Sequence, residues 1–369
     1  MEKLYQIALT HVEGVGGVSF RQLISHFGSA ENVFKAKTDK LLKISGIGQT
    51  IIEGLKSKNL LANAEKHLLE AEKKQITLLF STEKNYPSRL KLLYDAPAVL
   101  YYKGNADLSH FRTIGIVGTR QATDYGKKIT EELVHGIKPY NPLIVSGLAY
   151  GIDIAAHKSA LENKLPTIAV LASGLDIIYP SQHEKYIEQI CQEGGIISEN
   201  PLGMQPIRNL FIARNRIIAG LSDASVVIES ASKGGAMVTA EYANNYHREV
   251  FAVPGTLASK YSEGCNKLIK QNKANIYTKV DDIIEILNWN IESNVESQSK
   301  KTNSTELDLS LFTNEESQVI AHLRQHGEMQ IDELSWQTQI SINRVASLLL
   351  NLEFQGIIKA MPGKKFGLK

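Results

Sequence analysis

The chain has 369 residues, of which 43% are hydrophobic, and this predicts two or three ordinary globular domains. The formal net charge is only +2, so binding of a nucleic acid would require a local basic face. The two cysteines, Cys191 and Cys265, show no metal-ligand spacing, so we expect no metal, no cofactor and no disulfide framework. No 18-residue apolar run and no signal sequence occur, which indicates a cytoplasmic protein without a membrane span.

Residues 1–70 predict a helical domain of the helix-hairpin-helix (SAM-like) type. Two short turns, "EGVGG" at 13–17 and "SGIGQ" at 45–49, place Gly-apolar-Gly between apolar helical stretches. Free N–H groups at a helix start can hold a phosphate. The alternative is that glycine only permits a tight turn between helices.

Residues 71–288 predict an α/β domain. A bridging segment at 77–105 is followed by short apolar strands at 113–118, 143–149, 167–172, 195–199, 225–230 and 249–254. Helical segments lie between them, near 125–137, 152–163, 182–193, 212–221 and 237–247. This alternation predicts a Rossmann-like, doubly wound and mostly parallel sheet that is covered on both faces.

The pattern of residues 289–369 predicts a flexible linker followed by a small winged-helix domain. Residues 289–310 are polar, which is typical of a linker. Residues 311–369 show helices at 314–325, 330–337 and 341–354 and then a glycine-containing hairpin, the pattern of a winged helix-turn-helix. Its third helix is mostly apolar, and Lys364, Lys365 and Lys369 supply only weak phosphate contacts, so we expect poor duplex binding.

Glycine, hydroxyl and basic residues follow the predicted strands. Because the carboxyl ends of parallel strands meet at one edge, these residues should gather there and suit phosphate. The segment "ARNR" adds two arginines around an asparagine, and "SKGG" adds a glycine-rich loop. The predicted binding residues are Gly118, Thr119, Arg120, Ser146, Gly147, Gly174, Asp176, Tyr179, Lys185, Arg214, Asn215, Arg216, Lys233 and Gly234.

Structural roles compete with binding at several of these positions. Gly118 can serve only the strand-to-helix turn, and Arg214 and Arg216 can pair with carboxylates. For Asp153 and His157 we favour a structural pair at a helix start. No catalytic residue is expected, since GxGxxG, the P-loop, GxSxG and HExxH are all missing.

The motifs "GIVGTRQATDYG", "IVSGLAYGIDIAAH", "AVLASGLDIIYP", "ARNRIIAGLSD" and "VFAVPG…EGCNKLI" occur in this order between about 86 and 280. Together they make the chain resemble the DprA/Smf family of DNA-processing proteins. The resemblance implies single-stranded DNA binding, a homodimer, delivery of the strand to the RecA recombinase and displacement of single-strand-binding protein. It also implies that Arg120 is the leading DNA contact. Ser181 stands where the family often has lysine, and Lys185 can supply that charge instead.

The same region also resembles nucleotide phosphoribohydrolases of the lysine-decarboxylase-like type, which carry GGxGTxxE. Here the segment is "GGAMVTAE": Gly234, Gly235 and Glu241 match, whereas Met237 and Val238 replace the third glycine and the threonine. We therefore expect a binding protein and keep nucleotide cleavage as the alternative.

Overall fold

The computed structural model of the chain describes residues 1–289, 312–361 and 365–368. The chain divides into two units, Met1–Val295 and Glu296–Lys369, which we describe separately. Apart from Trp289, the linker predicted at 289–310 lies outside the described residues, as do Lys364 and Lys369. Trp289 itself is buried in the core of the first unit, so the linker prediction began one residue too early. None of the described helices is long and apolar enough to cross a membrane.

A nine-stranded sheet organises the first unit, in the order β1-β2-β6-β5-β4-β3-β7-β8-β9. From β6 to β9 every neighbouring pair is parallel, while β1–β2 and β2–β6 are antiparallel. The strands are β1 (Thr77–Phe80), β2 (Val99–Gly104), β3 (Thr113–Gly118), β4 (Leu143–Ser146), β5 (Thr167–Val170), β6 (Gly195–Ser198), β7 (Ala224–Ile228), β8 (Glu249–Ala252) and β9 (Asn275–Ile276).

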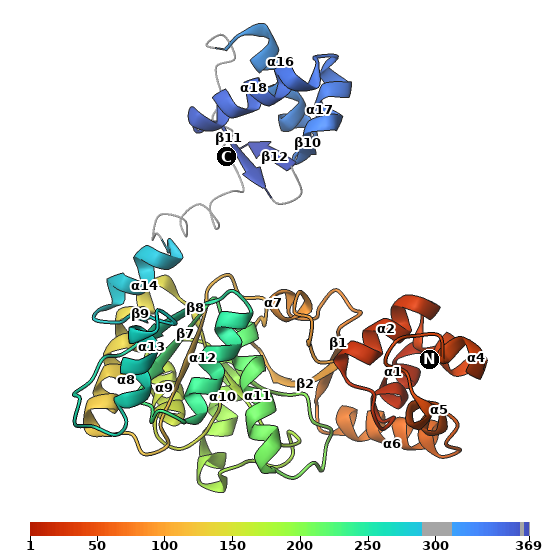
Figure 1. Cartoon of the computed structure of the whole chain (residues 1–369), viewed down its shortest axis with the longest axis vertical. Helices are drawn as coiled ribbons and strands as arrows, with labels where there is room; N and C mark the ends of the chain where they lie inside the picture. The colour runs from red at the N-terminus through yellow and green to blue at the C-terminus, as the bar shows by residue number, and fades with distance from the viewer. Residues whose placement is uncertain (290–311, 362–364, 369) are drawn as a thin grey trace. The chain divides into compact units, whose positions relative to one another are not determined.

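Helices cover both faces of this sheet, as predicted (Figure 1). Helices α8 (Asp124–Gly136), α9 (Ile152–Glu162) and α14 (Val280–Leu287) share one buried cluster with the strands. Helices α11 (Arg208–Leu221), α12 (Gly235–Asn245) and α13 (Glu263–Lys270) share another. The sheet is fully buried at its centre because β3, β4, β5 and β7 are almost entirely Val, Ile, Leu, Ala and small residues. The remaining segments are α7 (Ser88–Lys91), α10 (Ile187–Glu193) and the 3-10 turns Lys138–Tyr140 and Ser181–Tyr186.

The sequence missed strands β1, β2 and β9. The segment at 77–105 was interpreted as a bridge, but it contributes two antiparallel strands that extend the sheet beyond β6. Strand β9 has only two residues. Strands β1 and β2 are as long as the central strands β4 and β5, but a short apolar run does not by itself distinguish a strand from another buried segment, so only their pairing with each other and with β6 reveals them.

The N-terminal helices pack directly on this α/β unit. They are α1 (Glu2–Thr10), α2 (Gly17–Phe27), α3 (Ala30–Lys35), α4 (Thr38–Leu41), α5 (Gln49–Leu55) and α6 (Leu60–Lys73). One continuous hydrophobic cluster joins them to strands β1, β2, β5 and β6. The helices predicted as a domain at 1–70 therefore share one hydrophobic cluster with the sheet, and the domain boundary near residue 70 stays a prediction.

The two predicted Gly-apolar-Gly turns share one backbone geometry. Gly14 and Gly46 have φ of +84° and +82°, and Gly16 and Gly48 then cap the following helices in extended conformation. The first turn packs against the sheet unit, because a Cβ on Gly17 would lie 2.0 Å from the carbonyl oxygen of Ala96. That packing supplies a structural reason for Gly17, and the positive φ supplies one for Gly14; phosphate contact at these turns stays a prediction.

The second unit has the predicted winged-helix arrangement. Its helices α16 (Asn314–His326), α17 (Ile331–Thr338) and α18 (Ile342–Phe354) precede a sheet of order β10-β12-β11, with β10 at Met329–Gln330, β11 at Ile358–Met361 and β12 at Lys365–Leu368. Thr313 and Glu316 form a capping box that starts α16. On α18, Leu348, Leu349 and Leu352 are buried whereas Leu350 is exposed, so the apolar third helix mainly builds the core of this unit.

A buried histidine makes the stability of the first unit depend on pH. His157 on α9 is fully buried and its Nδ1 lies 2.7 Å from Oγ1 of Thr167 on β5, so its partner is Thr167 and not the expected Asp153. Burial, with help from His183 and Arg214, lowers the pKa of His157 to about 3.

We expect unfolding free energy to fall as pH drops below about 6.5, because the unfolded histidine then binds a proton that the folded one refuses. By pH 5 this single group should cost about 2 kcal/mol. Denaturant unfolding of wild type and His157→Gln at pH 7.5 and pH 5 measures it. Equal pH dependence in the two proteins would show that His157 is not the group responsible.

Candidate functional site

A cavity of about 630 Å³ opens at the carboxyl ends of the central strands. It lies where the chain turns from one half of the sheet to the other, since β3 pairs with β4 on one side and with β7 on the other. Open α/β sheets bind ligands at this switch point. We call it the β3/β7 cavity; its walls are residues 117–120, Ala149, Asp153, Arg208, Phe211, Ile212, Arg214, Asn215, Ile218, Ser230, Ala231, residues 233–236, Val238, Thr239 and Tyr261.

Charge in the lining of this cavity is predominantly positive. Arg120, Arg208, Arg214 and Lys233 are its basic members, and Asp153 is its one acidic member. Arg120, Arg208 and Lys233 are exposed, so their cationic groups are open to an incoming ligand. A cavity of this charge favours an anion.

An aromatic side chain lies beside the leading arginine. The guanidinium carbon of Arg120 lies 5.2 Å from the ring centroid of Phe211, within the range of a cation–π contact. Phe211 in turn meets Tyr179 edge to face, with ring centroids 5.5 Å apart, and Tyr179 is 45% exposed. Tyr179 therefore lies next to the cavity through Phe211, and the site offers flat apolar surface as well as charge.

A buried arginine forms the floor of the cavity. Arg214 is 4% exposed, and its Nη1 donates to the carbonyl oxygens of Gly147, at 2.5 Å, and of Val170. A Cβ on Gly147 would lie 2.4 Å from this Nη1, so only glycine lets the guanidinium reach the strand end. Burial lowers the pKa of Arg214 to about 10, against the opposing effect of Asp153. Burial likewise raises the pKa of Asp153, and Arg214 opposes that rise.

Helix α12 directs its N-terminus at the cavity. Gly234 is its N-terminal cap in extended conformation, and Gly234, Gly235 and Ala236 all line the wall. The side-chain amide of Asn215 donates to the carbonyl oxygen of Gly235 at 3.2 Å and so ties α11 to this turn. The positive end of the helix dipole therefore adds to the charge of Lys233 beside it.

Six predicted residues besides Arg120 line the cavity: Gly118, Thr119, Arg214, Asn215, Lys233 and Gly234. Gly118 also has a packing role, because a Cβ there would lie 1.9 Å from the carbonyl oxygen of Ile228. Arg214 was predicted as a ligand contact; the structure places it beneath the surface, where it acts through its charge and its hydrogen bonds.

Gly147 and Tyr179 adjoin the cavity through Arg214 and Phe211, whereas the other five predicted residues lie away from its wall. Ser146 is fully buried and donates to the carbonyl oxygen of Ile116 at 2.6 Å. Arg216 lies on another face of α11, where it pairs with Glu199 and donates to the carbonyl oxygen of Asp95 at 2.6 Å.

Three further predicted residues lie around the loop after β5. Gly174 packs against the carbonyl oxygen of Pro201, which a Cβ would approach to 2.6 Å. The carboxylate of Asp176 accepts from the N–H of Gly203 at 2.9 Å and from Lys74 at 3.2 Å. Burial works to raise the pKa of Asp176, but these donors hold it below the usual value. Lys185 is exposed, with Nζ 5.2 Å from the ring centroid of Tyr186.

Sequence reasoning missed Arg208, Phe211 and Tyr261. Helix α11 begins at Arg208, four residues earlier than predicted, because its cap Ile207 has no side-chain hydrogen bond that the sequence could reveal. Arg208, Phe211 and Asn215 lie at helical spacing of three and four residues, the one signal that could have placed them on a single face. No comparable signal marks Tyr261.

The arrangement of side chains gives little support to nucleotide cleavage, the alternative function. Glu241, the carboxylate that nucleotide cleavage would use, is exposed on α12 and is not part of the cavity wall. Met237, which replaces the third glycine of the motif, is not part of the wall either, because its side chain packs into the core against Gly264. Among the described residues no group of three or more His, Cys, Asp or Glu side chains could hold a metal ion.

Comparison with known proteins identifies the family. Residues 77–288 match the family described as DNA recombination-mediator protein A, and residues 301–364 match the DprA winged helix domain. The Smf protein of Synechocystis sp. is 41% identical over 272 residues, which are 73% of this chain and 68% of that protein.

Two solved structures agree with this match. DNA processing protein A of Streptococcus pneumoniae has a TM-score of 0.64 at 32% identity, over 76% of this chain and 97% of that one. DNA processing protein A of Helicobacter pylori, whose structure concerns its single-stranded DNA binding mode, has a TM-score of 0.50 at 32% identity, over 62% of this chain and 98% of that one. The chain therefore belongs to the DNA recombination-mediator protein A family, whose members are also named DprA and Smf.

Proposed function

We propose that this protein binds single-stranded DNA and that the β3/β7 cavity is the central contact. The observation that carries the proposal is the convergence of Arg120, Arg208 and Lys233 with the N-terminus of α12 on one cavity at the switch point of the sheet. These groups suit a phosphate, because arginine and lysine pair with its oxygens and a helix start adds N–H donors.

The aromatic side chains beside the cavity favour a single strand over a duplex. Phe211 and Tyr179 offer ring surface next to Arg120, and an unpaired base can stack on such a surface whereas a paired base cannot. Tyr179, which is 45% exposed, makes part of this ring surface open to an incoming base. The related protein of H. pylori is described in a single-stranded DNA binding mode.

The partners of the proposed activity follow from the family. We extend the proposal to a homodimer in the cytoplasm that protects incoming DNA during natural transformation, displaces single-strand-binding protein and loads the RecA recombinase. Its support is membership in a family described as recombination mediators, together with likeness to DNA processing proteins of S. pneumoniae and Bacillus subtilis. Of the two apolar residues on α13 that are candidates for the dimer interface, Leu268 is 3% exposed and belongs to the protomer core, so the proposal is kept for the partly buried Ile269 alone.

The direct test compares single-stranded and duplex DNA of equal length across a salt series. We expect preferential binding of the single strand, with log affinity falling linearly with log salt by roughly 0.7 per phosphate neutralised. Electrophoretic shift or fluorescence anisotropy measures both quantities. Equal or tighter binding to blunt duplex would contradict the proposal.

Replacing Arg120 should separate binding from folding. Its side chain is exposed at the cavity, so Arg120→Ala should leave thermal melting unchanged while it weakens single-strand binding ten- to a hundred-fold, or about 1.5–3 kcal/mol. Lys128→Ala is the matched control, since it removes an exposed charge from α8 outside the cavity wall. Affinity that is unchanged by Arg120→Ala, or equally reduced in both variants, would place the DNA contact elsewhere.

Removal of the winged helix tests the division of roles between the two units. The outer face of α18 presents Ile342, Leu350 and Phe354, and its Arg344 is paired with Glu315, so few free charges face a DNA groove. A chain ending at residue 290 should therefore keep its single-strand affinity within about tenfold, near 1.4 kcal/mol. It should also remain a dimer in light scattering. A larger loss would make the winged helix a principal DNA contact, and a monomer would place the dimer interface in the tail.

We also infer that the protein does not cleave nucleotides. Asp153, the one carboxylate in the cavity wall, is buried beside Arg214, and Glu241 lies outside the wall. Incubation with nucleoside monophosphates should release no free base detectable by chromatography. Release at an enzyme-like rate that disappears in Glu241→Ala would replace the binding function with the phosphoribohydrolase alternative.

A further inference from the structure

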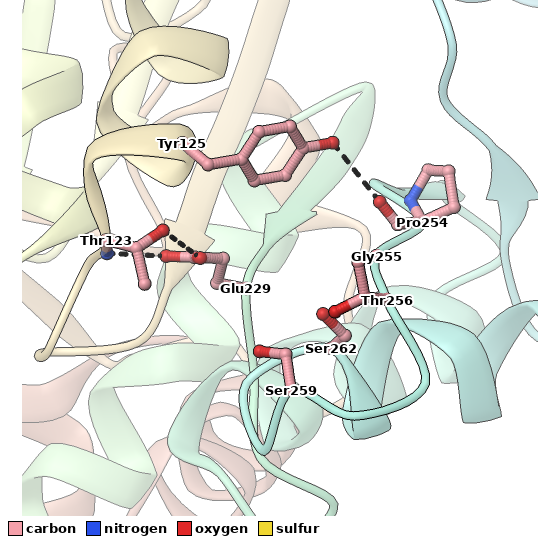
Figure 2. A pocket seen from close by; sticks show the side chains of 8 residues that line it. All are labelled: Thr123, Tyr125, Glu229, Pro254, Gly255, Thr256, Ser259 and Ser262. Carbon is pink, nitrogen blue, oxygen red and sulfur yellow. Dashed lines mark hydrogen bonds between the residues drawn. The ribbon is translucent and has the colours of Figure 1, made fainter.

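A second cavity lies at the same edge of the sheet, on the side of strand β8. Its volume is about 530 Å³, which is within the usual range of small-ligand sites. Figure 2 shows its walls: Thr123 and Tyr125 at the start of α8, Glu229 directly after β7, and the loop after β8 with Pro254, Gly255, Thr256, Ser259 and Ser262. We call it the β8 cavity. None of the residues assigned above to DNA lines it.

A buried carboxylate with a strained backbone forms one wall of this cavity. Glu229 is 6% exposed and has a φ of +54°, a left-handed conformation that a non-glycine residue seldom adopts without a functional or structural reason. Its two carboxylate oxygens accept from the N–H and the hydroxyl of Thr123, at 2.9 and 2.5 Å. A carboxylate offers about four acceptor positions, so Glu229 can accept further hydrogen bonds from a ligand.

Hydroxyl groups form the opposite wall. Figure 2 shows the side chains of Thr256, Ser259 and Ser262 on the loop that faces Thr123 and Glu229. None of these three hydroxyl groups has a hydrogen-bond partner within the described part of the chain, and Ser262 is only 8% exposed. None of the three is a buried group without a partner, so each hydroxyl is open to solvent and can donate to or accept from a polar ligand.

The charge of the cavity excludes an anion and favours a hydrogen-bond donor. Glu229 is the one charged residue among the eight that line it, and no lysine or arginine does. A phosphate here would meet a buried carboxylate without a compensating cation, which is costly. A neutral group that presents N–H donors to the carboxylate is favoured instead.

The remaining wall is flat. The ring of Tyr125 is half exposed and stands across the cavity, held by a hydrogen bond of 3.3 Å from its hydroxyl to the carbonyl oxygen of Pro254 (Figure 2). An aromatic ring beside a carboxylate suits a planar ligand that can stack and donate from its edge. Guanine fits this description, because its N1–H and its amino group lie side by side on one edge and match the two oxygens of a carboxylate.

We propose that the β8 cavity binds a nucleobase, with guanine preferred, through donation to Glu229 and stacking on Tyr125. In the context of DNA this inference rests on the proposed single-strand binding. The two cavities adjoin along the chain: Glu229 and Ser262 line the β8 cavity, while their neighbours Ser230 and Tyr261 line the β3/β7 cavity. A strand whose phosphate occupies the β3/β7 cavity can therefore place a neighbouring base in the β8 cavity, which adds a base preference to a contact otherwise made through charge.

Nucleosides test the cavity without any phosphate contact. Guanosine titrated into the full-length protein, followed by calorimetry or by ligand-observed NMR, should bind saturably and at least tenfold more tightly than uridine. Inosine, which differs from guanosine only by the missing amino group, should bind more weakly than guanosine. Glu229→Gln should remove most of the difference between guanosine and inosine, with thermal melting to check that the fold is kept.

Two substitutions in one loop provide the matched controls. Thr256→Trp fills the cavity from its wall and should abolish guanosine binding, whereas Leu257→Trp adds the same ring at a neighbouring side chain that is 93% exposed and should leave it intact. Because these variants avoid Glu229, they keep the test valid even where Glu229→Gln fails to fold.

The outcomes distinguish this proposal from the DNA-binding proposal. Arg120→Ala should keep guanosine binding while it loses single-strand affinity, and guanosine binding in a protein that binds no DNA would refute only the proposed function. Absence of nucleoside binding at millimolar concentration, or equal binding by Thr256→Trp and wild type, would overturn the nucleobase site. Tighter binding of free arginine than of guanosine would also overturn it and would assign the cavity to a cation.

Discussion

The burial of Arg214 is the interaction on which the proposed DNA site depends. Its guanidinium donates to the carbonyl oxygens at the ends of β4 and β5, so it joins helix α11 to two neighbouring strands. Removing a buried cation that has a nearby carboxylate leaves the carboxylate uncompensated, which typically costs several kcal/mol. Asp153 would be that carboxylate here. The same charge that holds the edge of the sheet together makes the cavity above it electropositive.

The carboxyl edge of the sheet carries two cavities whose linings differ in charge. On the β3 and β7 side, arginine, lysine and a helix N-terminus gather, and phosphate is the group they suit. On the β8 side, Glu229 follows β7 and accepts from the N–H of Thr123 at the start of α8, and hydroxyl groups line the same cavity. The two cavities are neighbours along the chain, and the loops around them are tied together where the hydroxyl of Tyr261 donates to the side-chain oxygen of Gln121. The proposed phosphate site next to the proposed base site is the arrangement that a nucleotide unit requires.

Resemblance to the phosphoribohydrolase motif does not by itself give this chain the ability to cleave nucleotides. The segment "GGAMVTAE" keeps the glycines that start α12 at the cavity wall, where we propose phosphate contact, but the exposed Glu241 lies outside this wall. Function is decided by the site and not by the fold. In this chain the motif keeps Gly234, Gly235 and Glu241, but only the two glycines line the cavity, and this is why we propose binding and not cleavage.

The sequence by itself determined the fold class, the winged helix and most of the loops that surround the β3/β7 cavity. Hydrophobic periodicity is local, so six central strands and their helices could be predicted, and the rule for carboxyl ends of parallel strands then brought Gly118, Arg120 and Lys233 together. Only the tertiary structure decided the direction of individual side chains. Arg214 and Arg216 are two residues apart, yet one lies under the cavity and the other pairs with Glu199, because successive positions on a helix point about 100° apart. Strands β1 and β2, the stacking of Phe211 on Arg120 and the whole β8 cavity likewise depend on contacts between segments far apart in the chain, which no local pattern encodes.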